Sequence, residues 1–340
     1  MKRFLPIILG VFTLCFLLSC SKTVSPVFSI PAKDPNVLKI AFGSCSDEKK
    51  AQPLWKDIVA ESPDLWIWLG DNIYGDTEDM EVMKTKYNTQ KSNPGYKALM
   101  ATCPIIGTWD DHDYGVNDGG KEFTAKAGSQ QALLDFLDYD SNDPVRSQEG
   151  VYDTYVLDHA FAKVKVILLD CRYFRDSYEK DNKWPIPNYG GTILGDAQWE
   201  WLESELAKKE ADVTIIASGI QVIPSEHRFE KWSNFPNEKH RLFDTVIDSG
   251  NKNCFFISGD RHIGEISKEM HEDYPFYDIT SSSLTHGWKI RREEPNARRI
   301  GNIVYDINYG VIEITKKEDL SIKAYLKTKG QAVLTSIVLD

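Results

Sequence analysis

The chain has 340 residues, of which 41% are hydrophobic and 11% aromatic, and its formal net charge is −11. This length suits one large α/β domain or two small ones, and the pattern of apolar runs favours one. The negative charge argues against nucleic acid or an anionic membrane surface as the main partner.

The first residues have the pattern of an export signal. A basic start, MKR, precedes an apolar run over residues 4–18, and the run ends at the segment LLSC. This pattern is typical of a signal peptide, and LLSC resembles the lipobox that lipoprotein signal peptidase cuts before the cysteine. We therefore expect removal of residues 1–19, a lipid on Cys20, and an exported protein anchored at the cell envelope. The alternative is a transmembrane anchor, but the run is shorter than the ~20 apolar residues that a spanning helix needs.

The rest of the chain reads as a short tether followed by one α/β domain. Residues 20–36 show no periodicity, so we expect the lipidated cysteine and a tether there, and a domain over residues 37–340. Short, nearly continuous apolar runs are typical of strands buried on both faces. They cover residues 37–42, 65–69, 104–109, 163–169, 213–217 and 254–258. Residues 52–61 and 196–208 place apolar side chains on one helical stripe, so strand and helix alternate as in an α/β sheet.

Polar segments follow each apolar run. They are, in chain order, GSC, GDNIY, DDHD, DCR, SGIQ and GDRH. Because ligands bind beyond the carboxyl ends of strands in open α/β sheets, these segments predict one active-site rim. After them, residues 302–340 read as antiparallel strands joined by short polar turns.

The segment WDDHDYGVND carries the densest charge. Like charges this close together are costly unless a cation neutralises them, and the alternative is a solvated acidic loop. The polar residues concerned are Asp110, Asp111, His112, Asp113, Asn117 and Asp118.

Two other strand ends offer metal ligands. Asp71 and Tyr74 lie in GDNIYGD, where the carboxylate could bridge two hard cations, although a GD pair can equally be a plain turn. Asp260 and His262 lie two residues apart, a spacing that in an extended segment aims both side chains to the same side. Carboxylate with imidazole suits a transition metal.

Arg172 and Arg261 are the candidate phosphate contacts, because a guanidinium binds phosphate through two parallel hydrogen bonds. The alternative is a structural salt bridge, from Arg172 to Asp170 or Asp176, or from Arg261 to Asp113.

Cys45 could be a thiolate ligand, a disulfide partner or a small buried filler. An exported protein can form disulfides. The predicted strand ends allow only two pairings, Cys45 with Cys171 or Cys103 with Cys254, because disulfides need Cα atoms within about 7 Å.

Several of these segments together resemble a known family. FGSC, LGDNIYGD, WDDHDYGVND, LDCRYFRD, LGDAQWEWL, IIASGIQV and SGDRH follow one another over about residues 40 to 290. This order resembles the PhoD-like alkaline phosphatases of the calcineurin-like metallophosphoesterase superfamily. The resemblance implies an α/β sandwich of mixed β-sheets flanked by helices, and metal-dependent hydrolysis of phosphate monoesters, diesters or both.

The resemblance also implies cofactors and roles. A ferric ion would be held by Cys45, Asp71, Tyr74 and Asp260. Calcium ions beside it would be held by Asp71, Asn117, Asp111 and His262. His112 stands where the superfamily keeps the histidine that assists the leaving group. Longer members carry an extra N-terminal β-domain and a C-terminal helix over the site, so we expect a more open site here.

Two other functions stay open at this point. One is a cysteine hydrolase with Cys45 as nucleophile and His262 or His112 as base, which leaves the acidic segment without a purpose. The other is a ligand-binding surface lipoprotein without catalysis, which missing metal ligands would favour.

Overall fold

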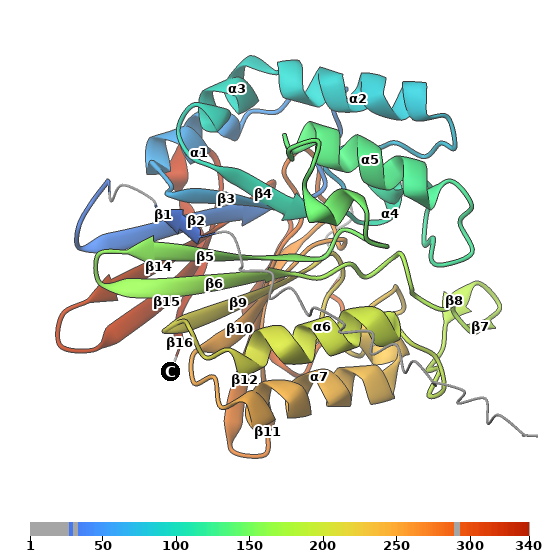
Figure 1. Cartoon of the computed structure of the whole chain (residues 1–340). Helices are drawn as coiled ribbons and strands as arrows, with labels where there is room; N and C mark the ends of the chain where they lie inside the picture. The colour runs from blue at the N-terminus through green and yellow to red at the C-terminus, as the bar shows by residue number, and fades with distance from the viewer. Residues whose placement is uncertain (1–26, 30–32, 289–292, 340) are drawn as a thin grey trace, which may run out of the picture.

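The computed structural model describes residues 27–29, 33–288 and 293–339 (Figure 1). The predicted export signal and Cys20 lie outside the described residues, so the lipid anchor stays a prediction. Over the described part of the chain, no helix has both the length and the apolar character to cross a membrane.

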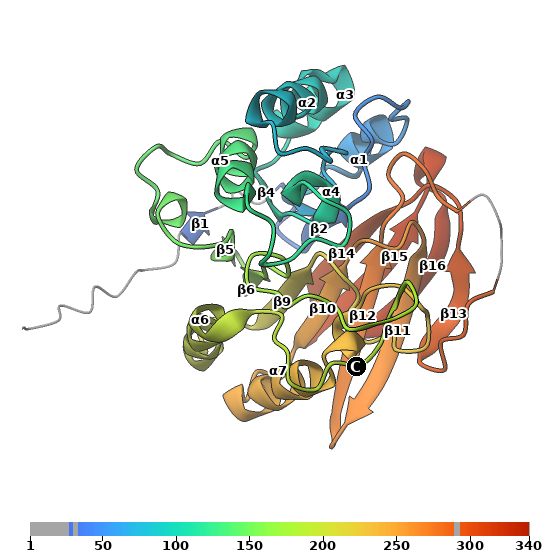
Figure 2. The ribbon, with the colours of Figure 1, turned by 90° about the vertical axis from the view of Figure 1, so that its right-hand side faces the viewer.

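Two large mixed β-sheets form the centre of the molecule (Figures 1 and 2). The eight-stranded sheet has the order β1 (Val27–Ser29), β5 (Asp153–His159), β6 (Ala162–Leu168), β9 (Val213–Ser218), β10 (Cys254–Ser258), β12 (Tyr274–Ser281), β11 (Gly264–His271) and β13 (Arg299–Val304). The six-stranded sheet has the order β16 (Val333–Leu339), β15 (Leu320–Lys327), β14 (Tyr309–Lys316), β2 (Val37–Gly43), β3 (Leu65–Leu69) and β4 (Ile105–Thr108). A small hairpin joins β7 (Lys180–Asp181) to β8 (Trp184–Pro185).

Helices cover the outer face of each sheet (Figure 1). On the six-stranded sheet they are α1 (Trp55–Glu61), α2 (Met80–Ser92), α3 (Pro94–Met100) and α5 (Lys126–Phe136). On the eight-stranded sheet they are α6 (Gly195–Ala207) and α7 (Pro236–Ser249). The one-turn helix α4 (Asp111–Tyr114) follows β4, and 3₁₀ turns occur at Pro144–Arg146, Trp232–Asn234 and Lys329–Gln331.

The apolar runs form strands because both faces of each sheet are covered. In β3, Leu65, Ile67 and Leu69 point into the core between the sheets, whereas Trp66 and Trp68 pack beneath the helices. All five are fully buried, which is why the run shows no polar alternation. The six predicted strands are thereby confirmed as β2, β3, β4, β6, β9 and β10.

These six strands direct their carboxyl ends to one edge. Within each sheet the pairs β2–β3, β3–β4, β6–β9 and β9–β10 are parallel. The two sheets meet at that edge, where Thr108, the last residue of β4, donates its hydroxyl proton to the carbonyl oxygen of Leu169, which follows β6, at 2.8 Å. The predicted rim is therefore built jointly by both sheets.

Some elements differ from the predictions. The antiparallel strands near the C-terminus are confirmed as β13 to β16, and helices 52–61 and 196–208 as α1 and α6. The predicted tether, however, contains β1, which pairs in parallel with β5 and forms the edge of the eight-stranded sheet. Three residues are too few to show a period, so the pattern could not reveal this strand.

Candidate metal and phosphoester site

Left-handed backbone conformations mark the edge where the six strands end. Cys45, Asp71, Asp260 and His262 have φ angles of 59°, 48°, 71° and 55°. A side chain other than glycine in this region costs of order 1–3 kcal/mol and persists where the surroundings hold it, often at a functional site. The conformation also corrects one expectation, because the segment from Asp260 to His262 is not extended, although both side chains line one cavity.

Asp113 holds the loops together through the backbone. Its Oδ1 accepts the N–H groups of Asp110 and Asp71 at 2.7 and 3.1 Å, and its Oδ2 accepts the backbone and side-chain N–H groups of Asn72. Both oxygens are thus engaged in shaping the ends of β3 and β4. Asp113 positions the site and does not face it.

The ligand atoms of the candidate metal residues fall into overlapping groups. Cys45, Asp71 and His262 form one group within 4.8 Å, and Asp71, Asp111 and His112 form another. Two more groups are Asp110 with Glu230 and Asp260, and Asp111 with Asp118 and Glu230. Asp71 belongs to two groups, and its predicted role as a bridging ligand stays a prediction. His262, not Asp260, groups with Cys45.

The site has the chemistry of a cation site. Asp110 Oδ2, Asp111 Oδ1 and Asp260 Oδ2 are buried and have no hydrogen-bond partner among the described residues. Burial raises the pKa of the carboxyl groups of Asp71, Asp110 and Asp260, and repulsion from neighbouring carboxylates adds to this. Such a set is stable as carboxylates only when a cation offsets the charge. The residues therefore fit metal ions.

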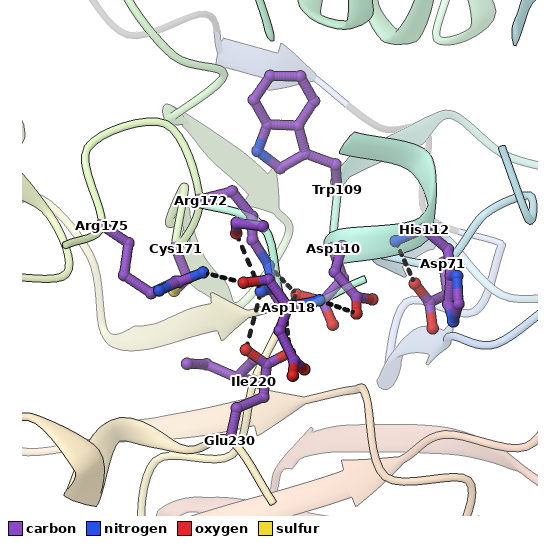
Figure 3. Close-up of polar contacts among 12 residues, drawn as sticks. Asp71, Trp109, Asp110, His112, Asp118, Cys171, Arg172, Arg175, Ile220 and Glu230 are labelled. Carbon is purple, nitrogen blue, oxygen red and sulfur yellow. Dashed lines mark hydrogen bonds and ion pairs between the residues drawn. The ribbon is translucent and has the colours of Figure 1, made fainter. Parts of the chain in front are cut away.

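The structure gives Arg172 a different role from phosphate binding. Its guanidinium lies fully buried between Asp110 and Glu230 (Figure 3). Nε and Nη2 donate to Asp110, Nη1 and Nη2 donate to Glu230, and Nη1 also donates to the carbonyl oxygen of Gly119. All five N–H donors of a guanidinium are then engaged. The predicted salt bridge to Asp170 or Asp176 is also wrong, since the partners come from loops more distant in the sequence.

Arg261 lines the same cavity as the metal groups, but its guanidinium forms an ion pair with Glu294, which is not part of those groups. Its Nη2 donates to Glu294 at 2.5 Å, and not to Asp113, whose oxygens are used as described above. Its Nε is buried without a partner among the described residues. Its guanidinium lies 4.3 Å from the ring centre of Phe229.

His112 is held by a carboxylate and by an aromatic ring. Its Nδ1 lies 2.7 Å from Asp76 Oδ1, and its ring lies 4.2 Å from the ring of Tyr74. Burial alone would lower the pKa of His112, but the hydrogen bond to Asp76 and the charges of Asp71 and Asp111 raise it to about 10. With Nδ1 engaged, Nε2 is the nitrogen that can give a proton to a ligand.

The hydroxyl of Tyr74 lies between two histidines, one of which, His262, belongs to the metal group of Cys45. Its hydroxyl oxygen is 2.9 Å from His262 Nε2 and 3.2 Å from His286 Nε2. Burial, with nearby negative charge, raises the pKa of Tyr74 well above its ordinary value. A tyrosinate at this position therefore requires a bound cation.

The surroundings of Cys45 argue against a nucleophile. The side chain is fully buried, and Sγ lies 3.2 Å from Ser282 Oγ and 3.3 Å from Asp71 Oδ2. Burial raises the pKa of the thiol to about 12, whereas a nucleophilic cysteine needs a lowered pKa and access to substrate. Burial also lowers the pKa of His262 to about 3, and Tyr74 occupies its Nε2. Cys45, Cys103, Cys171 and Cys254 are free thiols.

One cavity of about 290 Å³ joins the metal groups to the surface. Of the predicted residues, Asp71, Asp111, His112, Asn117, Asp260, Arg261 and His262 line it. Glu230 also lines it and was missed, because it lies in the loop after β9 without a motif around it. Trp184, Phe229 and Trp288 complete the wall and were likewise missed.

Comparisons with known proteins agree on one family. The model of the PhoD-like phosphatase family matches residues 40–306. The chain is similar to alkaline phosphatase D of Bacillus subtilis (strain 168), with 25% identity over 301 residues, 75% of this chain and 51% of the relative. It thus spans about half the length of this curated relative.

Solved structures share the fold. A structure of PhoD has a TM-score of 0.74 at 19% identity and is matched over 93% of this chain and 71% of its own. GAP50, described as the anchor in the inner membrane complex of Plasmodium, has a TM-score of 0.59 at 17% identity, with coverages of 90% and 89%. A dimetal phosphatase from Danio rerio has a TM-score of 0.51 at 13% identity, with coverages of 89% and 98%. Because a phosphatase and an anchor share this fold, activity must be argued from the site.

Proposed function

Because the chain belongs to the PhoD-like phosphatase family, we propose that it hydrolyses phosphate esters with metal ions held at the site described above. One observation carries the proposal: Asp111 and Asp260, each with a buried carboxylate oxygen that has no partner among the described residues, line a cavity open to solvent together with two imidazoles. The thiol of Cys45 lies in one metal group with two residues of that lining, Asp71 and His262. Bound cations would offset the charge on phosphoryl oxygens and ease the deprotonation of a water molecule.

The proposed metals are a ferric ion and calcium. Thiol and phenol ligands favour a metal softer than calcium, so we assign the iron to Cys45, Asp71 and Tyr74, with Asp260 and His262 as the candidates to complete the set. The oxygen ligands of the second group suit calcium. We assign calcium to Asp71, Asp111 and Asn117. Asp118 and Glu230 lie beside this site, because they form a group with Asp111.

His112 is the proposed general acid. Asp76 fixes its Nδ1, so Nε2 can pass a proton to the departing alkoxide of the ester. Arg261 remains the candidate cation for the phosphoryl group, because it lines the cavity and its Nε has no partner among the described residues. Arg172 is assigned a positioning role, since it holds Asp110 and Glu230 in place.

We also propose that the protein is exported and anchored by a lipid on Cys20. This rests on the N-terminal sequence pattern alone.

Metal analysis followed by an ester assay tests the function. The purified protein should contain iron and calcium, and it should hydrolyse p-nitrophenyl phosphate, bis-p-nitrophenyl phosphate or both. Chelation should remove the activity, and readdition of the metals should restore it. Protein that binds these metals tightly and turns over neither ester would refute the proposal.

A further inference from the structure

An aromatic wall, made of Trp184, Phe229 and Trp288, lies in the same cavity as the metal groups. The rings of Trp184 and Phe229 meet edge to face at 5.5 Å, and those of Phe229 and Trp288 do so at 5.2 Å. The rings come from three separate segments, namely the β7–β8 hairpin, the loop after β9 and the segment after β12. All three are only partly buried, unlike the core tryptophans Trp66 and Trp68.

The aromatic wall is tied to the proposed metal ligands. The indole nitrogen of Trp288 donates to the carbonyl oxygen of Arg261 at 2.8 Å, and its backbone N–H donates to that of His262 at 3.2 Å. Phe229 directly precedes Glu230, whose carboxylate is held by Arg172. A phosphoryl group at the metals would therefore bring its organic substituent next to these rings.

Cations already surround the aromatic wall. Arg261 lies 4.3 Å from the ring centre of Phe229, and Arg228 and Lys183 lie 4.2 and 4.9 Å from that of Trp184. A quaternary ammonium group binds aromatic rings through its positive charge, and cations already at the rings would repel it, whereas they would not repel a neutral heterocycle. The arginines and the lysine make such a ligand unfavourable here. Rings flanked by guanidinium groups instead resemble the surfaces on which nucleobases stack.

The size of the cavity limits the ligand. Its volume of about 290 Å³ lies near the lower end, ~300 Å³, of small-molecule sites. It suits a mononucleotide or the end of a longer ester. The basic residues at its mouth also favour an anionic ligand, although the chain as a whole is acidic.

We propose that the aromatic wall is a subsite for a planar heterocycle, and that the preferred substrates are nucleotide-type phosphate esters. This inference rests on the proposed function and adds the substrate class to it. Trp184 contributes its ring from the β7–β8 hairpin, and specificity should depend on it most cleanly, because its ring contacts are Phe229, Arg228 and Lys183, which are not proposed metal ligands.

The test compares two esters that differ only in the base. Adenosine 5′-monophosphate and ribose 5-phosphate have the same kind of leaving group, so a preference for the first reports the base. In the wild type we expect a higher kcat/KM for adenosine monophosphate. Trp184→Ala should reduce the ratio of the two values roughly tenfold, within the range for loss of one base–aromatic stack. Trp184→Phe should restore most of it.

A matched control and a binding measurement make the test decisive. Trp201 is also partly buried and has one aromatic neighbour, Tyr152 at 4.8 Å, but lies outside the cavity, so Trp201→Ala should keep the ratio. Calorimetry on the metal-loaded protein with the non-hydrolysable 5′-phosphonate analogues of the two esters should show the same preference. If the analogues bind with a base preference that needs Trp184 but no ester is hydrolysed, the subsite stands and the proposed function falls. Equal binding of both analogues, or tighter binding of phosphocholine than of ribose 5-phosphate, overturns the subsite.

Discussion

Asp76→Asn separates a general-acid role of His112 from a purely structural one. The substitution keeps the size of the side chain and can still accept a hydrogen bond, but it removes the charge that faces His112 Nδ1 at 2.7 Å. If His112 protonates the leaving group, the loss should depend on how much help that group needs. An alkoxide needs a proton, whereas nitrophenolate leaves almost unaided.

The expected size follows from the exposure of the pair. A hydrogen bond between charged groups contributes ~1.5–3 kcal/mol, which corresponds to roughly 10- to 150-fold in rate. The side chain of Asp76 is 47% exposed and that of His112 is 19% exposed, so water screens the pair. We therefore expect about a tenfold loss of kcat for glycerol phosphate and little change for p-nitrophenyl phosphate. His112→Ala should lose more on glycerol phosphate, ~10²- to 10⁴-fold.

The pH dependence gives a second measurement with a defined sign. Although burial opposes it, the hydrogen bond to Asp76 and the charge of nearby carboxylates raise the pKa of His112. A general acid works only below its pKa. Removal of the Asp76 charge lowers that pKa, so the loss of activity on glycerol phosphate should begin at lower pH in Asp76→Asn than in the wild type.

Another aspartate–histidine pair supplies the control. Asp244 and His271 also lie 2.7 Å apart, on the outer surface near α7, and the Asp244 side chain is 57% exposed. Asp244→Asn should leave kcat for both glycerol phosphate and p-nitrophenyl phosphate unchanged. Equal losses on both substrates in Asp76→Asn, at unchanged metal content, would refute the general-acid role and leave His112 as a structural or metal-binding residue.

Four further substitutions test other parts of the site. Asp71→Asn should lose bound metal and at least 10²-fold in activity together, measured by elemental analysis and kinetics, because this carboxylate belongs to two metal groups. If Tyr74 binds a ferric ion, the wild type should show a visible charge-transfer band, and Tyr74→Phe should abolish it. Colourless wild-type protein that is fully active would contradict the iron assignment. Arg172→Met should lower the free energy of unfolding by about 3–5 kcal/mol in urea titrations, because two buried carboxylates lose their partner. Cys20→Ala should release the protein from membranes or block its processing, and unchanged membrane fractionation would contradict the lipid anchor.

The fold could be predicted where burial alone decides the sequence. Strands covered on both faces are apolar throughout, so runs such as LWIWL at β3 identify themselves. Helix α2 was missed because it has a largely polar surface, with only Met83, Tyr87 and Gln90 buried. Helix α7 carries a detectable stripe of Leu242, Phe243 and Val246, so its signal was present but unused.

The sequence predicts where the site lies more reliably than it predicts the role of each residue in the site. The carboxyl ends of the strands bring the motifs together whatever conformation the loops adopt, so the position of the site follows from the sheet topology. Glu230 and the three rings of the aromatic wall come from loops and a short hairpin whose paths depend on contacts far away in the chain. Tyr178, for example, donates to Glu230 at 2.7 Å from a segment 52 residues earlier. No local pattern records such a contact.

The acidic segment after β4 shows why spacing does not assign function. Its aspartates look alike in the sequence, yet Asp113 spends both oxygens on backbone N–H groups of neighbouring loops. One oxygen of Asp110 accepts from Arg172, and the other is buried without a partner in the described part of the chain. One oxygen of Asp111 likewise accepts from the backbone N–H of Asp118, and the other has no partner among the residues that the structure describes. A carboxylate can hold a cation only with an oxygen that the fold has not already used, and that depends on partners elsewhere in the chain.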